Sequence, residues 1–218
     1  AQLLDWYEYW HTILDTSDAP CWKWFAGGKI NASYNCIDRH LPKNKNKTAI
    51  HFVPELESEK IEHITYQELY VRVNEFAALL QDFAGLKAGD RVTLHMPMTA
   101  ELPITMLACA RIGVIHSEVF GGFSGKAAAD RMVDSGSRVL ITIDSYYRGG
   151  TLVDHKEKAD IAVEAAEKDG QIVDKVLVWQ RYPGKYSASI PMVEGRDFFV
   201  NDLLKKYYGK RIEPVPMP

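Results

Sequence analysis

The loop at residues 120–124 carries the residues whose types and spacing are best suited to ligand binding. Its two adjacent glycines, Gly121 and Gly122, let the backbone approach a ligand closely or adopt a positive φ. A helix start directly after them offers free N–H groups to an anion, and the rings of Phe120 and Phe123 can contact a flat heterocycle. The alternative is that the glycines only make the tight turn from a strand into a helix. The residues alone leave both interpretations open.

A second glycine-containing loop follows the next predicted strand and holds Arg148, Gly149, Gly150 and Thr151. A guanidinium beside two glycines and a helix start can hold a phosphate through two parallel hydrogen bonds. The alternative is a solvated arginine on a flexible loop.

The first of these loops does not match the two nucleotide-binding fingerprints that it resembles. Residues 121–125 are not G-x-G-x-x-G, because Phe123 occupies the third position. Residues 121–127 resemble a P-loop but are one residue short and have Ala127 where Ser or Thr must contact magnesium. Both fingerprints are therefore rejected, and a dinucleotide-dependent oxidoreductase is disfavoured.

The other reactive residue types give weaker signals. The histidines on the predicted strands show no paired ligand spacing to each other or to the cysteines: His51, His63, His95 and His116. Ser117 and Ser124 lack the G-x-S-x-G elbow, and Cys109 lies in an apolar helix as a small core residue. We therefore predict no metal site and no catalytic residue in this chain.

Alternating strands and helices position the two loops. Strands are predicted at 91–96, 114–120, 139–143 and 175–180, with helices at 100–112, 124–133 and 153–168. This alternation predicts an α/β fold with a mainly parallel sheet flanked by helices. Ligands of such sheets gather at the carboxyl ends of the strands. We therefore expect the loops at 97–99, 120–124 and 146–151 to meet at one edge.

The flanking regions are less regular. Residues 1–46 form an irregular, aromatic-rich N-terminal extension, with a short helix predicted at 3–14, irregular chain through Trp22, Trp24 and Phe25, and a solvated loop at 43–47. We expect this extension to pack on the main body, residues 47–218. That body begins with strands at 48–53 and 61–64 and a helix capped by Thr65. Residues 197–208 are predicted to form one short helix, and the Pro-rich end resembles an interrupted connection.

Composition restricts the class of protein. Of 218 residues, 46% are hydrophobic and 25% charged, and the net charge is −3, with Lys and Arg scattered along the chain. These values are typical of a soluble globular protein and disfavour nucleic-acid binding. Three cysteines without a C-x-x-C pair suit the reducing cytoplasm. We expect no signal peptide and no membrane span, since no stretch approaches the ~18 apolar residues that a span needs.

Two long stretches resemble one family, the AMP-forming acetyl-CoA synthetases of the adenylate-forming acyl-CoA synthetase superfamily. Residues 111–124 resemble the family stretch R-I-G-A-x-H-x-x-x-F-G-G-F-S. Residues 22–40 resemble the entry segment W-F-x-G-G-x-L-N-x-x-x-N-C-x-D-R-H. Residues 65–69 and 89–92 also fall where the superfamily has T-Y-x-E-L and G-D-x-V. The resemblance runs from about Trp6 to the end of the chain.

The resemblance implies an enzyme that activates acetate or a similar short-chain acid with Mg-ATP, giving an acyl-adenylate and pyrophosphate. CoA then displaces AMP to form the acyl-CoA. The implied partners are these small molecules and the remainder of the same polypeptide. By resemblance, Phe120, Gly121 and Gly122 lie beside the CoA adenine, and Arg148 contacts a CoA phosphate. Thr151 belongs to the same proposed CoA site.

The sequence departs from the family pattern in two ways. Thr151 stands where the pattern R-x-G-R has a second arginine, so a phosphate would be held by one charge fewer. The family's phosphate loop, ATP-binding motifs, acid pocket and catalytic lysine are not found before Pro218. We therefore expect the main body to be an incomplete N-terminal domain, truncated before the ATP phosphate loop and inactive alone. The alternatives are a stand-alone CoA- or nucleotide-binding module without catalysis, or a regulatory protein that kept only the fold.

Overall fold

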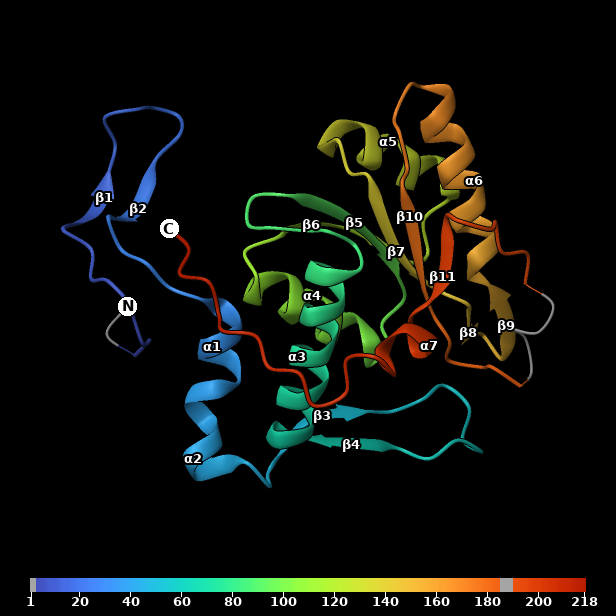
Figure 1. Cartoon of the computed structure of the whole chain (residues 1–218), viewed down its shortest axis with the longest axis horizontal. Helices are drawn as coiled ribbons and strands as arrows, with labels where there is room; N and C mark the ends of the chain where they lie inside the picture. The colour runs from blue at the N-terminus through green and yellow to red at the C-terminus, as the bar shows by residue number, and fades with distance from the viewer. Residues whose placement is uncertain (1–2, 185–189) are drawn as a thin grey trace.

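The computed structural model describes residues 3–184 and 190–218, and a parallel sheet lies at its centre (Figure 1). The strand order is β11-β10-β7-β5-β6, and each neighbouring pair is parallel. The strands span Arg91–Met96 (β5), Ile115–Phe120 (β6), Val139–Ile143 (β7), Lys175–Trp179 (β10) and Asp197–Phe199 (β11). The predicted α/β fold and its four strands are confirmed, and β11 is an addition to them.

Helices cover both faces of the sheet. The helices α3 (Tyr66–Asp82) and α4 (Glu101–Arg111) pack on one face, and α5 (Gly125–Ser135) and α6 (His155–Lys168) pack together on the other. The buried run of β7 serves both faces, since Leu140 joins the α5–α6 side and Ile141 the α3–α4 side. A strand covered on both faces has no polar side, so β7 appears in the sequence as a continuous apolar run.

The start of α3 is set by the predicted capping box. The Glu68 N–H donates to the Thr65 hydroxyl at 3.2 Å, and the Thr65 N–H donates to the Glu68 carboxylate at 2.8 Å. Before this helix, β3 (Thr48–Phe52) and β4 (Glu62–Thr65) form an antiparallel hairpin. Its register brings the Nδ1 atoms of His51 and His63 to 2.9 Å, a pairing that sequence spacing did not indicate.

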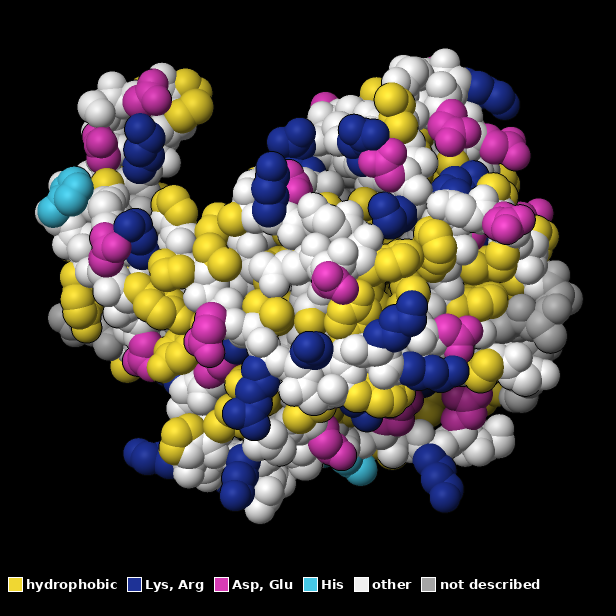
Figure 2. All heavy atoms as spheres, in the orientation of Figure 1, with side chains coloured by type: hydrophobic (Ala, Val, Ile, Leu, Met, Phe, Trp, Pro, Cys, Tyr) yellow, Lys and Arg dark blue, Asp and Glu magenta, His cyan; other side chains and the backbone are white. Residues whose placement is uncertain are grey.

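The helix predicted at 3–14 is wrong. Instead, β1 (Thr12–Asp15) pairs with β2 (Lys23–Ala26) as an antiparallel hairpin, called the arm here. The rings of Trp6 and Trp10 pack against Phe25 of β2, with centroids 5.5 and 5.1 Å apart. An isolated helix of this length needs a core to bury its apolar face. Residues 3–14 are mostly exposed, and the arm projects from the main body (Figure 2), so ring contacts to β2 take the place of such a core.

Residues 31–46 form α1 (Ala32–Cys36), η1 (Asp38–His40) and α2 (Leu41–Asn44), of which α1 packs on α4 and α2 packs on α3. The short helix α2 occupies the beginning of the predicted 43–47 loop. The Asn31 amide donates to the carbonyls of Ala110 and Val215, each at 2.8 Å. Ile30 and Met217 exchange two backbone hydrogen bonds. The N-terminal and C-terminal segments therefore meet at the end of α4.

The single helix predicted at 197–208 is also wrong. Residues Asp197–Phe199 form the edge strand β11, and only Val200–Leu204 (α7) is helical. A strand of three residues has too little alternation to be seen in sequence, and here its pairing with β10 determines it. Within the described parts of the chain, no helix has the length and apolar character needed to cross a membrane.

Candidate functional site

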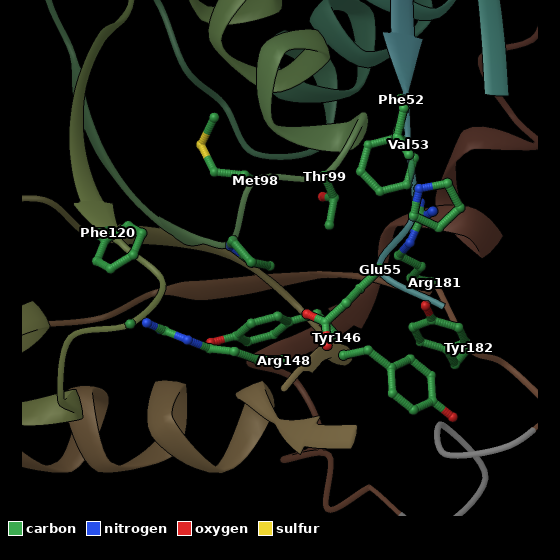
Figure 3. A pocket seen from close by; sticks show the side chains of 14 residues that line it. Phe52, Val53, Glu55, Met98, Thr99, Phe120, Tyr146, Arg148, Arg181 and Tyr182 are labelled. Atoms are coloured by element: carbon green, nitrogen blue, oxygen red, sulfur yellow. The ribbon is translucent and has the colours of Figure 1, made fainter. Parts of the chain in front are cut away.

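A cavity of about 260 Å³ opens at the carboxyl edge of the sheet (Figure 3). All three predicted loops contribute to its lining: Pro97, Met98 and Thr99; Phe120 and Gly122; and Tyr146, Tyr147 and Arg148. The rule that ligand sites form where parallel strands end therefore located this side of the cavity from sequence.

The predicted loop at 146–151 is a β-hairpin. Its strands are β8 (Ser145–Arg148) and β9 (Thr151–Asp154), so α6 begins at His155 rather than near Val153. Gly149 and Gly150 have φ of 60° and 74°. Two consecutive positive φ values define the kind of two-residue turn that favours glycine. The Gly150 N–H donates to the Glu55 carboxylate at 2.6 Å, which ties this turn to the loop after β3.

Arg148 and Phe120 come together across the cavity. The Arg148 guanidinium carbon lies 5.7 Å from the centroid of the Phe120 ring, and Figure 3 shows the side chain extending toward that ring. Phe120 also meets Phe123 edge to face at 5.7 Å. A cation over a half-exposed ring offers both a charge and a flat apolar surface. Thr151 pairs with Arg148 across the turn, is exposed, and is not among the cavity-lining residues.

Gly121 and Gly122 do not have a positive φ, so their backbone conformation does not require glycine. Glycine is needed at these positions because other atoms lie too close to leave room for a Cβ. A Cβ on Gly121 would lie 2.7 Å from the Pro97 nitrogen and 2.9 Å from the Met96 carbonyl carbon. A Cβ on Gly122 would meet the Phe120 ring and the Arg148 guanidinium, at 2.6 Å for Nη1. Gly121 therefore makes room for neighbouring backbone, and Gly122 makes room for the two candidate binding side chains.

This difference predicts unequal costs for two alanine substitutions. Gly121→Ala is expected to lower the free energy of unfolding by about 2–3 kcal/mol, because backbone must move. Gly122→Ala is expected to cost less than about 1 kcal/mol, because side-chain ends can shift. Urea denaturation of both variants measures the two costs. Equal costs would contradict this assignment of the two glycines.

Beneath loop 120–124, the Gly121 carbonyl accepts hydrogen bonds from the Tyr146 hydroxyl at 3.3 Å and the Lys158 ammonium at 3.2 Å. His155 lies alongside, with its Nε2 2.9 Å from the His95 carbonyl. Burial, helped by the Lys158 charge, lowers the pKa of His95 to about 4, and burial, helped by His95 and Lys158, lowers that of His155 to about 3. Both imidazoles are therefore neutral at pH 7. Ser124 caps α5 as predicted, accepting from the Ala127 N–H at 3.3 Å.

The opposite wall of the cavity was not predicted. It comes from residues 52–55 at the end of β3 and from Arg181 and Tyr182 after β10. The backbone N–H groups of Arg181 and Tyr182 both donate to the buried Asp144 carboxylate at 3.0 Å. The carboxyl-edge rule, applied to the strand at 175–180, would have found these two residues. The 52–55 segment lies outside the main sheet, so only the tertiary structure places it.

Two carboxylates hold Arg181 in this second wall of the cavity. The Arg181 guanidinium contacts Glu62 at 2.8 Å and Glu101 at 3.0 Å, and its carbon lies 4.4 Å from the Phe52 ring centroid. Burial opposes its charge, but the two carboxylates outweigh that effect and raise the pKa of Arg181. Burial, with Glu59 nearby, raises the pKa of Tyr182 to about 12. Arg181 is thus neutralised by carboxylates, whereas Arg148 has no carboxylate within 4 Å among the described residues.

Cavity, loops and sheet together define an α/β protein with a candidate site for a flat, anionic ligand. Residues 37–196 match the family described as AMP-binding enzyme, and residues 1–36 match the one described as acetyl-coenzyme A synthetase N-terminus. The chain belongs to the AMP-binding enzyme family.

Its relatives include two curated synthetases. The chain is 45% identical over 217 residues to a 3-hydroxypropionyl-coenzyme A synthetase of Sulfurisphaera tokodaii, covering 99% of this chain and 31% of the relative. It is 42% identical to an acetyl-coenzyme A synthetase of Methanothrix soehngenii, covering 97% of this chain and 30% of the relative. The chain thus spans about a third of the length of these relatives.

A solved structure shares the fold. Acetoacetyl-CoA synthetase from Streptomyces lividans superposes with a TM-score of 0.79 at 20% identity, covering 99% of this chain and 31% of that one. At this identity the likeness concerns the fold alone.

Proposed function

We propose that this chain forms the CoA-binding part of an AMP-forming acyl-CoA synthetase. The longer polypeptide would convert acetate or a similar short-chain acid, with Mg-ATP and CoA, to acyl-CoA, AMP and pyrophosphate through an acyl-adenylate. The observation that carries the proposal is the position of Arg148 over Phe120, beside Gly122, in the cavity at the carboxyl edge. The named relatives support the reaction class.

The chemistry of the site suits the adenosine end of CoA. The half-exposed Phe120 ring and the backbone of Gly121 and Gly122, which carries no side chains, offer a surface for adenine. The Arg148 guanidinium offers two donors to a phosphate. Thr151 adds a hydroxyl at the same turn but no charge. ATP, Mg²⁺ and the carboxylic acid would bind to the part of the polypeptide that follows.

The chain is proposed to consist of residues 1–46, an extension on the main body, and residues 47–218, an incomplete domain that ends before the ATP phosphate loop. Contacts of Asn31 with α4 support this packing. The arm is different, because Trp22 and Trp24 at its surface are 57% and 62% exposed. These rings suit contact with later parts of the longer polypeptide. The free cysteines support a cytoplasmic location.

Two assays test the proposal. With acetate, Mg-ATP and CoA, the 218-residue chain is expected to release no pyrophosphate, because the residues that would hold a triphosphate are not among its own. Clear turnover would contradict this. Calorimetric titration with CoA then separates two cases. Micromolar affinity would favour a working binding module, and no binding would favour an incomplete site.

Arg148→Met provides the residue-level test. In a chain that binds CoA, the substitution is expected to weaken CoA affinity by roughly tenfold or more, the usual value of a charge-assisted hydrogen bond. Arg138→Met is the matched control, since Arg138 is an exposed arginine paired with Asp174 away from the cavity. Equal CoA affinities for the two variants would show that Arg148 does not bind CoA.

A further inference from the structure

Lys158 is a half-buried cation without a carboxylate partner. Its ammonium donates to the Gly121 carbonyl at 3.2 Å, and no carboxylate oxygen of the described residues lies within 4 Å of it. Lys156 on the same helix has the opposite environment, with ion pairs to Asp160 at 2.6 Å and Asp197 at 2.9 Å. A partly desolvated charge is normally paired, so an unpaired one suggests that an anion completes its environment.

The acidic residues beside Lys158 at the start of α6, Asp154 and Glu157, form no ion pair with it, and the Asp154 carboxylate caps the helix by accepting from the Glu157 N–H at 2.8 Å. His95 and His155 are buried and neutral, and the Tyr146 hydroxyl shares the same carbonyl acceptor. The next cation along the loop is Arg148, whose guanidinium lies against Gly122. Opposite Arg148 in the hairpin register stands the neutral Thr151. Two cations without carboxylate partners among the described residues thus border two consecutive glycines, Lys158 at the Gly121 carbonyl and Arg148 at Gly122, and their fields add at this loop.

We propose that Lys158 is a positioning residue of the anion subsite at loop 120–124. It holds the Gly121 carbonyl and adds a positive charge behind the loop, so that a phosphate bound at Arg148 experiences a second cation. The ligand class is a phosphomonoester or diphosphate group, and CoA as its carrier rests on the proposed function above.

Lys158 would act on a bound phosphate in two ways, by holding the Gly121 carbonyl in place and by its electrostatic field. It is not among the cavity-lining residues, whereas Gly122 and Arg148 are. At the short range set by neighbouring loop residues, a partly buried charge changes the affinity for an anion by roughly fivefold. Added salt reduces this contribution where the charges are partly solvated. A purely structural hydrogen bond to Gly121 would not depend on salt.

The test compares Lys158→Gln, which removes the charge but keeps a donor, with Lys158→Arg, which keeps the charge. Calorimetric titration of the 218-residue chain with CoA is expected to give about fivefold weaker binding for Lys158→Gln and near wild-type binding for Lys158→Arg. The difference should shrink at high salt, while the melting temperature stays the same. Lys126→Gln is the matched control for net charge, since Lys126 is exposed on α5 near the same loop.

Equal losses in Lys158→Gln and Lys158→Arg, or no loss in either, would overturn the proposal. Inorganic pyrophosphate serves as a second probe, read as a rise in melting temperature. If CoA does not bind but pyrophosphate stabilises wild type and not Lys158→Gln, the anion subsite stands and the 218-residue chain holds an incomplete CoA site. If neither probe acts on wild type, the subsite itself is refuted.

Discussion

Replacing Arg111 with alanine is expected to lower the free energy of unfolding by about 3–5 kcal/mol, the usual cost of breaking a buried ion pair. Its two Nη atoms donate to the Asp38 carboxylate at 2.8 and 2.9 Å, and its Nε donates to the Ile212 carbonyl at 2.6 Å. The arginine side chain is 2% exposed and the aspartate side chain 15%. One side chain therefore joins η1, α4 and the C-terminal segment, and its removal leaves a carboxylate and a carbonyl unpaired.

Urea denaturation of wild type and Arg111→Ala measures this cost. Arg138→Ala is the matched control, because its pair with Asp174 is also 2.8 Å long but solvent-exposed, and exposed pairs contribute about 0–1 kcal/mol. Asp38→Ala and the double variant complete the cycle and isolate the pair from its neighbours. A loss no larger than that of Arg138→Ala would show that the pair does not attach the N-terminal segment to α4.

A marked acid sensitivity is expected from the buried His95 and His155. Their folded pKa values, about 4 and about 3, lie below the ordinary value of 6.5, so the unfolded chain takes up protons first as the pH falls. Stability is therefore complete above about pH 6.5 and decreases toward pH 4, by about 1.4 kcal/mol per pH unit for each histidine. His95 alone accounts for about 3 kcal/mol over this range. The Lys158 charge acts in the same direction, because it disfavours a second cation beside both rings.

Stability measured by urea denaturation at several pH values between 4 and 7 tests this. His155→Gln retains an N–H donor for the His95 carbonyl but cannot titrate, so the pH slope should become shallower by about one proton. His11→Gln is the control, since His11 is exposed on the arm. A slope unchanged in His155→Gln would mean that these imidazoles do not govern the acid response.

The sequence predicted the sheet and one side of the site because their signals are local. The strands β5, β6, β7 and β10 alternate with helices along the chain, Gly121 and Gly122 directly follow β6, and Arg148 comes shortly after β7. Carboxyl ends of parallel strands meet at one edge, so loops far apart in sequence were expected together. The Thr65 cap was visible for the same reason, since its partner Glu68 is three residues away.

Other features of the fold and site depend on contacts between residues far apart in the sequence, and no local pattern predicts them. The 3–14 segment has a helical pattern, but its residues are mostly exposed, and ring contacts of Trp6 and Trp10 to β2 determine its path. The strand β11 exists because β10 presents an open edge. The second wall of the cavity depends on Asp144, Glu62 and Glu101, which fix Arg181 and Tyr182 from distant positions.

The fold class and the loop that carries Phe120, Gly121 and Gly122 were predictable from the sequence, because hydrophobic periodicity and turn chemistry act over neighbouring residues. The structure decided that Gly121 is needed for Pro97, that Arg148 reaches Phe120, and that Lys158 lies unpaired behind the loop. These contacts join residues 24 to 37 positions apart, and their distances arise only when the packed helices and strands bring the side chains together.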